Sequence, residues 1–158
     1  MNMMTNPRQD QATTGLLAEY EKNHAELLGA MAVMDSATRA MLADRDLLSS
    51  ARWRLSNASL RRRMLWGRIY RHLAPRVGPH EAAALDSIQA TDIALQQQSA
   101  AHVGKWTKDA IEADWTGYCD ASRDIRWKMN AHIGAERRVV YPLLTADALD
   151  ERRQLRAP

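Results

Sequence analysis

The chain has 158 residues, 46% hydrophobic and 26% charged, a size and composition typical of one soluble globular domain with its own core. The formal net charge is +3, and acidic residues are interleaved with the basic ones, so no basic stripe of the kind that binds nucleic acid stands out. No stretch approaches the roughly 18 apolar residues of a membrane helix, so neither nucleic acid nor a membrane is an expected partner.

A cytoplasmic location is expected from the N-terminus and from cysteine usage. The first fifteen residues, MNMMTNPRQDQATTG, have neither a basic start nor an apolar run of signal-peptide length. The single cysteine, Cys119, has no partner for an intramolecular disulfide.

Hydrophobic periodicity predicts four amphipathic helices. The first two cover about residues 12–34 and 44–73, and a Pro-Gly-Pro cluster follows the second. The third covers about residues 81–110, and the fourth runs from residue 115 or 121 to residue 144. Pro142 falls late in the fourth helix, where a proline would kink or end the last turn.

Four long helices joined by short connections predict an all-α fold, an antiparallel up-down-up-down four-helix bundle. We expect this domain to cover residues 12–148. Residues 1–11 and 149–158 are read as polar N-terminal and C-terminal tails.

Polar residues interrupt the apolar stripes of all four predicted helices, at positions that face the expected core. His132 and Glu136 are four residues apart, so both side chains lie on one helix face and can reach a common metal ion. At about 1.5 Å of rise per residue, His24 falls at a similar depth, whereas His102 lies about two turns away. The inward polar set is His24, Arg62, Asp92, His102, His132 and Glu136. Among these, the candidate metal ligands are His24, His132, Glu136 and His102.

The fourth helix, HIGAERRVVYPLL, resembles the last helix of hemerythrin-like, or HHE cation-binding, domains, in which HxxxE precedes an apolar run. The first helix, EYEKNHAELLGAM, is similar to the opening helix of that family and carries His24. The resemblance implies a non-haem, typically di-iron site in a bundle core, with HxxxE pairs on the second and fourth helices. It also implies a role in binding or sensing iron, dioxygen or nitric oxide.

The second helix departs from the family pattern. Aligning Tyr70 with Tyr141 sets Arg61 and Leu65 opposite the histidine and glutamate of the fourth helix. Arginine stays protonated and cannot ligate iron. Either Arg61, by this alignment, or Arg62, by the apolar stripe, is expected to carry a guanidinium across the core to Glu136 or Asp92.

Two functional hypotheses from different classes follow. The first is a hemerythrin-like protein with a reduced or vestigial metal site, holding iron in a mononuclear or partial site and acting as a sensor or store. The second is a metal-free bundle, without a cofactor, whose basic surface binds a protein partner. That surface would consist of Arg61, Arg62, Arg63, Arg68, Arg71 and Arg76. No nucleophile elbow or phosphate-binding loop is present, so an enzyme is not the favoured class, and His72 and His80 are read as surface residues.

Overall fold

The structure is a computed structural model that describes residues 7–157, with side chains from Thr13 onward. Within this range every regular element is helical, which confirms the predicted all-α class. The elements are α1 (Pro7–Arg39), α2 (Arg45–Leu73), α3 (Pro79–Lys105), α4 (Lys108–Ala113) and α5 (Trp115–Arg156). None of these helices combines the length and the apolar character needed to cross a membrane.

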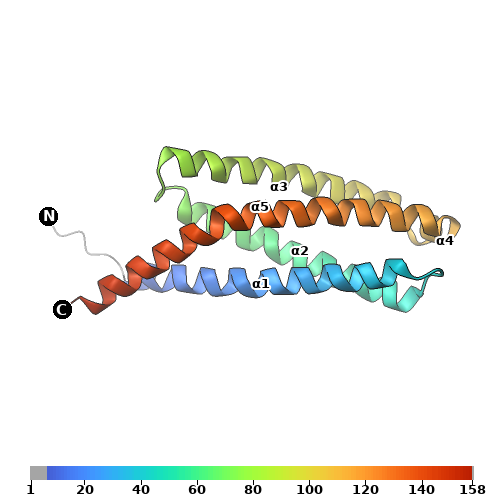
Figure 1. Ribbon diagram of the computed structural model, residues 1–158, viewed down its shortest axis with the longest axis horizontal. Coiled ribbons are helices and arrows are strands. Elements are labelled where there is room, and N and C mark those ends of the chain that lie inside the picture. The colour runs from blue at the N-terminus through green and yellow to red at the C-terminus, as the bar shows by residue number, and fades with distance from the viewer. Residues whose placement is uncertain (1–6, 158) are drawn as a thin grey trace.

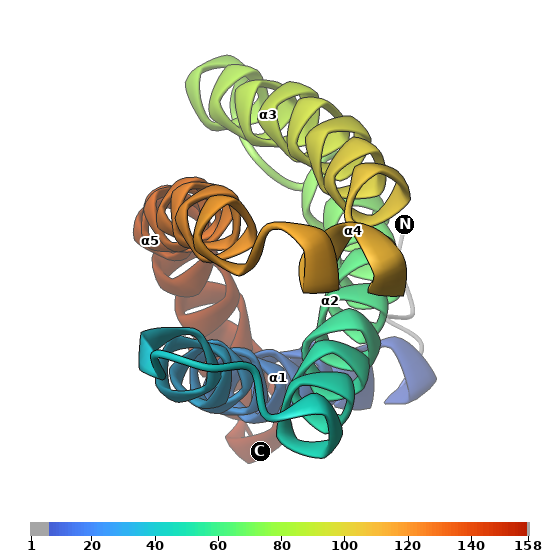
Figure 2. The same cartoon turned by 90° about the vertical axis from the view of Figure 1, so that its right-hand side faces the viewer.

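The four long helices lie alongside one another, and each runs opposite to the one before it (Figure 1). The helix α1 packs against α2 and α5, and α3 packs against α5. In contrast, α2 and α3 have few backbone contacts, and the view along the helices shows α3 set apart from α2 (Figure 2). Their side chains meet near the turn that joins them, where the Trp66 indole donates to Gln89 Oε1 at 3.0 Å and Tyr70 donates to Asp86.

Side-chain caps and a proline define the helix starts. The Asp44 carboxylate accepts from the backbone N–H of Leu47 at 3.0 Å and so starts α2. At α3, Pro79 occupies the first helical position, where its missing N–H costs nothing.

The predicted third helix, residues 81–110, is two helices in the structure. The helix α3 ends at Lys105, and the Thr107 hydroxyl accepts from Ala110 N at 3.3 Å to begin the short α4. The prediction of one helix was therefore wrong, because a threonine that caps the following N–H groups competes with helix continuation. Trp106, buried at the break, packs against Tyr118 of α5, and this contact folds α4 over the end of the molecule.

The last helix continues to Arg156, well beyond its predicted end at residue 144. Pro142 lies inside α5, and the ribbon changes direction towards its C-terminal third (Figure 1). A proline removes one backbone hydrogen bond and bends a helix, which need not stop there. The extension packs on α1, where Ala148 and Glu151 are buried and Thr14 donates to Glu151 at 3.2 Å.

The buried core lies mainly between α1, α2 and α5. One group of core residues lies near the turn between α2 and α3, and α3 adds Leu85 and Ile88 to it. These are the buried residues of α3. From Asp92 to Lys105 the side chains of α3 are half-buried or exposed, so half of this helix flanks the core without filling it.

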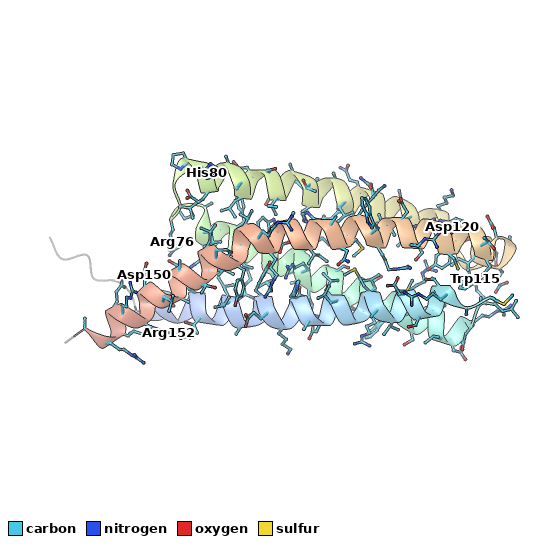
Figure 3. The ribbon with its side chains drawn as sticks, viewed as in Figure 1. Arg76, His80, Trp115, Asp120, Asp150 and Arg152 are labelled. Atoms are coloured by element: carbon cyan, nitrogen blue, oxygen red, sulfur yellow. The ribbon has the colours of Figure 1, made fainter. Side chains whose placement is uncertain are left out.

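The end of α5 is tied to α1 and α2 by a polar cluster. The fully buried Thr13 hydroxyl donates to Asp147 Oδ2 at 2.9 Å, and His72 Nε2 lies 2.8 Å from both oxygen atoms. His72 is thus a packed residue with a side chain 11% exposed, and its interpretation as a surface residue was wrong. His80, at the start of α3, is exposed, as expected (Figure 3).

We predict that Asp147→Ala lowers the free energy of unfolding by about 1–3 kcal/mol, because a buried hydroxyl and an imidazole lose their shared acceptor. Asp150→Ala is the matched control on the same helix, since Asp150 is exposed and lies 3.8 Å from Arg153. The control should change stability by less than about 0.5 kcal/mol. Urea unfolding followed by circular dichroism measures both, and equal losses would contradict the role of the cluster.

Candidate functional site

A buried ion pair crosses the centre of the molecule from α2 to α5. Arg62 Nη2 lies 2.5 Å from Glu136 Oε1, and the two side chains are 6% and 3% exposed. Arg62 Nη1 donates to Asn23 Oδ1 at 3.3 Å, and the guanidinium lies over the Tyr20 ring, 4.2 Å from its centroid. Asn23 in turn donates to the carbonyl of Ala58 at 3.2 Å. The pair is therefore enclosed by side chains of α1.

The predicted guanidinium in the core is confirmed, and Arg62 supplies it. Arg61 is 58% exposed and lies 3.3 Å from Glu26 on the outside. The apolar stripe of α2 identified the inward arginine, whereas alignment on Tyr70 selected its exposed neighbour. Because adjacent helical residues point about 100° apart, a shift of one position moves a side chain from the core to the surface.

Burial raises the pKa of Glu136, and the positive charge of Arg62 opposes that rise. Burial, followed by the nearby Glu136 charge, raises the pKa of Tyr20. Both directions follow from the cost of placing a negative charge in a region of low dielectric constant. The carboxylate of Glu136 thus depends on Arg62 for its counter-charge.

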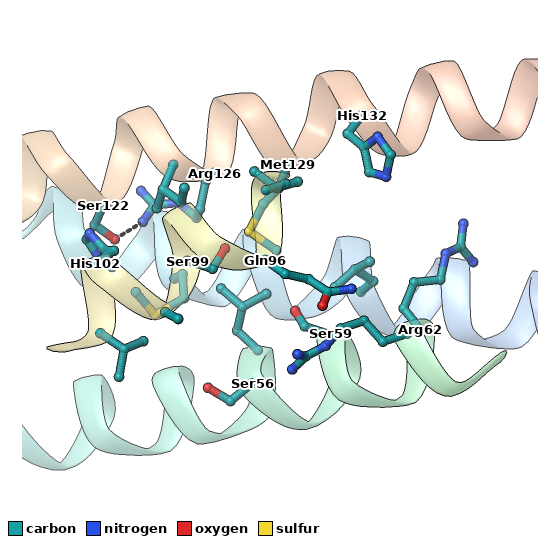
Figure 4. Close-up of a pocket in the computed structure, with 18 of the residues that line it drawn as sticks. Ser56, Ser59, Arg62, Gln96, Ser99, His102, Ser122, Arg126, Met129 and His132 are labelled. Carbon is teal, nitrogen blue, oxygen red and sulfur yellow. Dashed lines mark hydrogen bonds between the residues drawn. The ribbon is translucent and has the colours of Figure 1, made fainter. Parts of the chain in front are cut away.

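The three candidate histidines lie in different surroundings. His24 on α1 is half-buried, and burial lowers its pKa, as do the charges of Arg137 and Arg62. His132 on α5 is buried, with Nε2 3.5 Å from Asp92 Oδ1 and no hydrogen bond at either ring nitrogen. His102 lies towards the opposite end of the same interior, as Figure 4 shows.

These residues do not fit the di-iron group that the hemerythrin resemblance implies. The described residues contain no group of three or more His, Cys, Asp or Glu side chains placed to hold a metal ion. Glu136 is already paired with a guanidinium, and two arginines bring positive charge to His24. A cation beside them would meet repulsion in place of ligand charge.

A cavity of about 510 Å³, which the hydrophobic periodicity does not predict, extends from this ion pair along the interior. It is lined mainly by α2, α3 and α5, and Leu27 and Met34 of α1 also contribute (Figure 4). Several of the residues of α2 and α3 that line it are small or polar. They are Ser56 and Ser59 of α2 and Gln96, Ser99, Ala100 and Gly104 of α3.

The far end of the cavity contains two more arginines. Arg126 is buried and donates from Nε to Asp35 at 3.0 Å, from Nη2 to Thr38 at 2.9 Å, and from Nη1 to Ser122. Arg52 donates from Nη2 to the carbonyl of Trp106 at 3.1 Å. Arg126 was missed although a signal existed: stepping back from Glu136 by threes and fours reaches Ser122 and Arg126 on the buried face.

An aromatic group closes this end. Tyr118 of α5 is 1% exposed, and the His102 ring stacks on it with centroids 5.9 Å apart and planes at 28°. Trp106 and Trp115 contact the same ring, with centroids 5.6 and 5.8 Å away. His102 is therefore part of the wall at the far end and is not a partner of His132.

The Thr13, His72 and Asp147 cluster contains the residue types of a nucleophilic triad, but its geometry differs. Both the hydroxyl and the carboxylate contact the same ring nitrogen, Nε2. A triad needs the acid on one nitrogen and the nucleophile on the other. This cluster is structural.

Comparison of the chain with family models, with curated proteins and with solved structures found no match. The resemblance to hemerythrin-like domains thus depends only on the residues of the first and fourth predicted helices.

We predict that Arg62→Met lowers the free energy of unfolding at neutral pH by about 3–5 kcal/mol, because it leaves the Glu136 carboxylate buried without a partner. The double variant Arg62→Met with Glu136→Leu should lose less than the sum of the single changes. Arg61→Met, which removes the exposed neighbour, should change stability by less than about 0.5 kcal/mol. Urea unfolding of these three variants and of Glu136→Leu, with and without a chelator, measures each loss of stability. Additive losses together with a chelator-dependent midpoint would show that Glu136 serves a metal instead.

The loss of unfolding free energy in Arg62→Met, which is called its deficit below, should also depend on pH. Without the guanidinium, the pKa of Glu136 in the folded protein rises further above its unfolded value, so the folded state binds more protons between those two values. Stability then falls as pH rises through this window, and the deficit shrinks as pH is lowered from about 7 to about 5. Adding Glu136→Gln should remove this pH dependence, and a pH-independent deficit in Arg62→Met alone would contradict the assignment.

Proposed function

We propose that this chain is a metal-free binding protein of hemerythrin-like, up-down-up-down four-helix architecture that holds a small, largely apolar organic molecule in its interior cavity. The cavity is the observation that carries the proposal. Its volume of about 510 Å³ falls within the usual range of small-molecule sites, roughly 300–1,000 Å³. Its exposed wall is mostly apolar, with charged groups and histidines at its two ends and Ser56, Ser59, Gln96 and Ser99 between them (Figure 4).

The replacement of a metal by arginine supports the metal-free part of the proposal. In a metal site, a buried glutamate is compensated by the cation; here Arg62 provides positive charge at 2.5 Å from Glu136. A buried carboxylate with such a partner does not need a metal for its stability. The interior beyond this pair is then available for an organic ligand.

The side chains of α3 support the binding role. After Ile88, the residues of α3 that line the interior include Asp92, Leu95, Gln96 and Ser99, of which only one is a large aliphatic residue. An unfilled interior volume lowers stability in proportion to its size. A ligand that occupies it restores those contacts, and binding to the folded state alone stabilises the protein.

The alternative of a protein partner on a basic surface has weaker support. Two arginines of that surface are neutralised by α1, because Arg68 lies 2.6 Å from Glu19 and Arg61 lies 3.3 Å from Glu26. Arg62 is buried and cannot contribute to it.

We place the binding activity in the cytoplasm, in keeping with a free thiol at Cys119.

We predict that the neutral fluorophore N-phenyl-1-naphthylamine binds the protein with a stoichiometry near one and with a blue-shifted, enhanced emission. Ser99→Trp should weaken binding by about tenfold or more, because the half-buried Ser99 lines the cavity and an indole would fill the space. Ser87→Trp is the matched control, since Ser87 is exposed on the same helix and does not line the cavity. Fluorescence titration measures all three proteins.

Equal binding by Ser99→Trp and the unaltered protein would place the fluorophore outside the cavity and contradict the proposal.

The metal-free part of the proposal has a separate control, in which untagged protein is loaded with ferrous iron without oxygen and then desalted. Less than about a tenth of an equivalent of iron is expected. Stoichiometric iron that is lost in His132→Ala would restore the partial metal site.

A further inference from the structure

We infer that the natural ligand is an amphipathic monocarboxylate, a medium-chain fatty acid in chemical class, with its carboxylate beside Arg52 at the far end of the cavity. The inference rests on the proposed binding function and adds the charge and orientation of the ligand. Its chain would run along the apolar middle of the cavity towards His132.

The two ends of the cavity differ in the balance of their charges. At one end, Arg62 is neutralised by Glu136, and Asp92 lies beside His132. Among the described residues that line this end, the cation without an ion pair is Arg63, which is exposed to solvent. An anionic head group gains little at this end, because the nearest buried cation already has its carboxylate.

At the other end, Arg52 forms no ion pair with any described residue, and its one hydrogen bond goes to the uncharged carbonyl of Trp106. Arg52 is half-buried, whereas Arg126 at the same end is buried and has Asp35 as its partner at 3.0 Å. Positive charge from Arg52, Arg126 and Lys105 reaches His102 and lowers its pKa, after the larger effect of burial. This end of the cavity therefore has an excess of positive charge.

The position of Arg52 suits a carboxylate. Its guanidinium is held by the Trp106 carbonyl and lies 5.9 Å from the centroid of Tyr118, while Nε and Nη1 donate to no acceptor among the described residues. A guanidinium presents its N–H groups as a planar fork that matches the two oxygens of a carboxylate. The half-buried His102 stacks on the same tyrosine and adds a ring nitrogen to the wall.

The middle of the cavity suits an aliphatic chain. The apolar residues that line it between the two ends are Leu27, Leu55, Leu95, Ile125, Met129 and Ile133, and the polar side chains of Ser56, Ser59, Gln96 and Ser99 lie on the α2 and α3 side of the same stretch. Along α5, the distance from Ser122, at the far end, to His132 corresponds to about 15 Å at the rise of an α-helix. His132 and Asp92 mark where the apolar stretch ends, and this sets an upper limit on the length of the chain.

The test compares three probes of equal chain length, decanoate, decan-1-ol and decylammonium, below their aggregation limits. Each is titrated against full-length protein that carries bound N-phenyl-1-naphthylamine. Decanoate should displace the fluorophore at a concentration about tenfold lower than decan-1-ol does, and decylammonium should be the weakest. A preference for the ion over the more apolar alcohol requires a specific positive group.

Arg52→Gln should abolish the preference for decanoate and leave displacement by decan-1-ol unchanged. Arg52→Lys should restore part of the preference, because it returns the charge without the planar fork. Arg54→Gln is the matched control, since Arg54 is an exposed arginine of the same helix that does not line the cavity. Circular dichroism of each variant checks that it is folded.

The outcomes separate the two proposals. If the fluorophore binds in the cavity but decanoate and decan-1-ol displace it equally, or if Arg52→Gln keeps the preference, the carboxylate assignment is overturned and the binding function stands. If Ser99→Trp binds decanoate as tightly as the unaltered protein, measured by calorimetry, the anion lies on the surface and the assignment is again overturned. If neither the fluorophore nor any of the three probes binds, the binding function itself fails.

Discussion

The buried pair of Arg62 and Glu136 is the constraint on which the arrangement of the helices depends. Each charge alone in this interior would cost several kcal/mol, so α2 and α5 must place the two groups opposite each other. The helix α1 completes the site with the ring of Tyr20 and the amide of Asn23. Three helices are thus held in register by one polar group of residues, and apolar packing on either side of it follows that register.

The same pair changes what the interior can do. A carboxylate and nearby histidines on facing helices are the usual materials of a metal centre in a helical bundle. A guanidinium in their midst supplies the positive charge and removes the carboxylate as a free ligand. The polar residues near the centre contribute to stability and line part of the cavity.

The helix α3 takes no part in this central pair, and it lines one side of the cavity. It is anchored near its start by Leu85 and Ile88 and at its end by Trp106, which follows it and packs on Tyr118. Between these anchors, most of its residues that line the cavity are small or polar. Filling this volume with apolar side chains would stabilise the protein and would also remove the candidate binding site, which is the usual conflict between stability and function.

Sequence periodicity alone determined the helical class, the location of the four long helices and the inward direction of Arg62, His132 and Glu136, because each of these follows from local spacing of 3.6 residues per turn. Helix ends were less predictable: Thr107 interrupts the predicted third helix and Pro142 does not end the last one, since capping and tertiary packing compete with local preference there.

Only the tertiary structure decided that Glu136, and not Asp92, pairs with Arg62, that Thr13 meets His72 and Asp147, and that Arg52 and His102 share one end of a cavity. Periodicity specifies which face of a helix points inward, but not the height of each helix relative to its neighbours. Nor does it specify the space left when side chains of different volume meet across the interior.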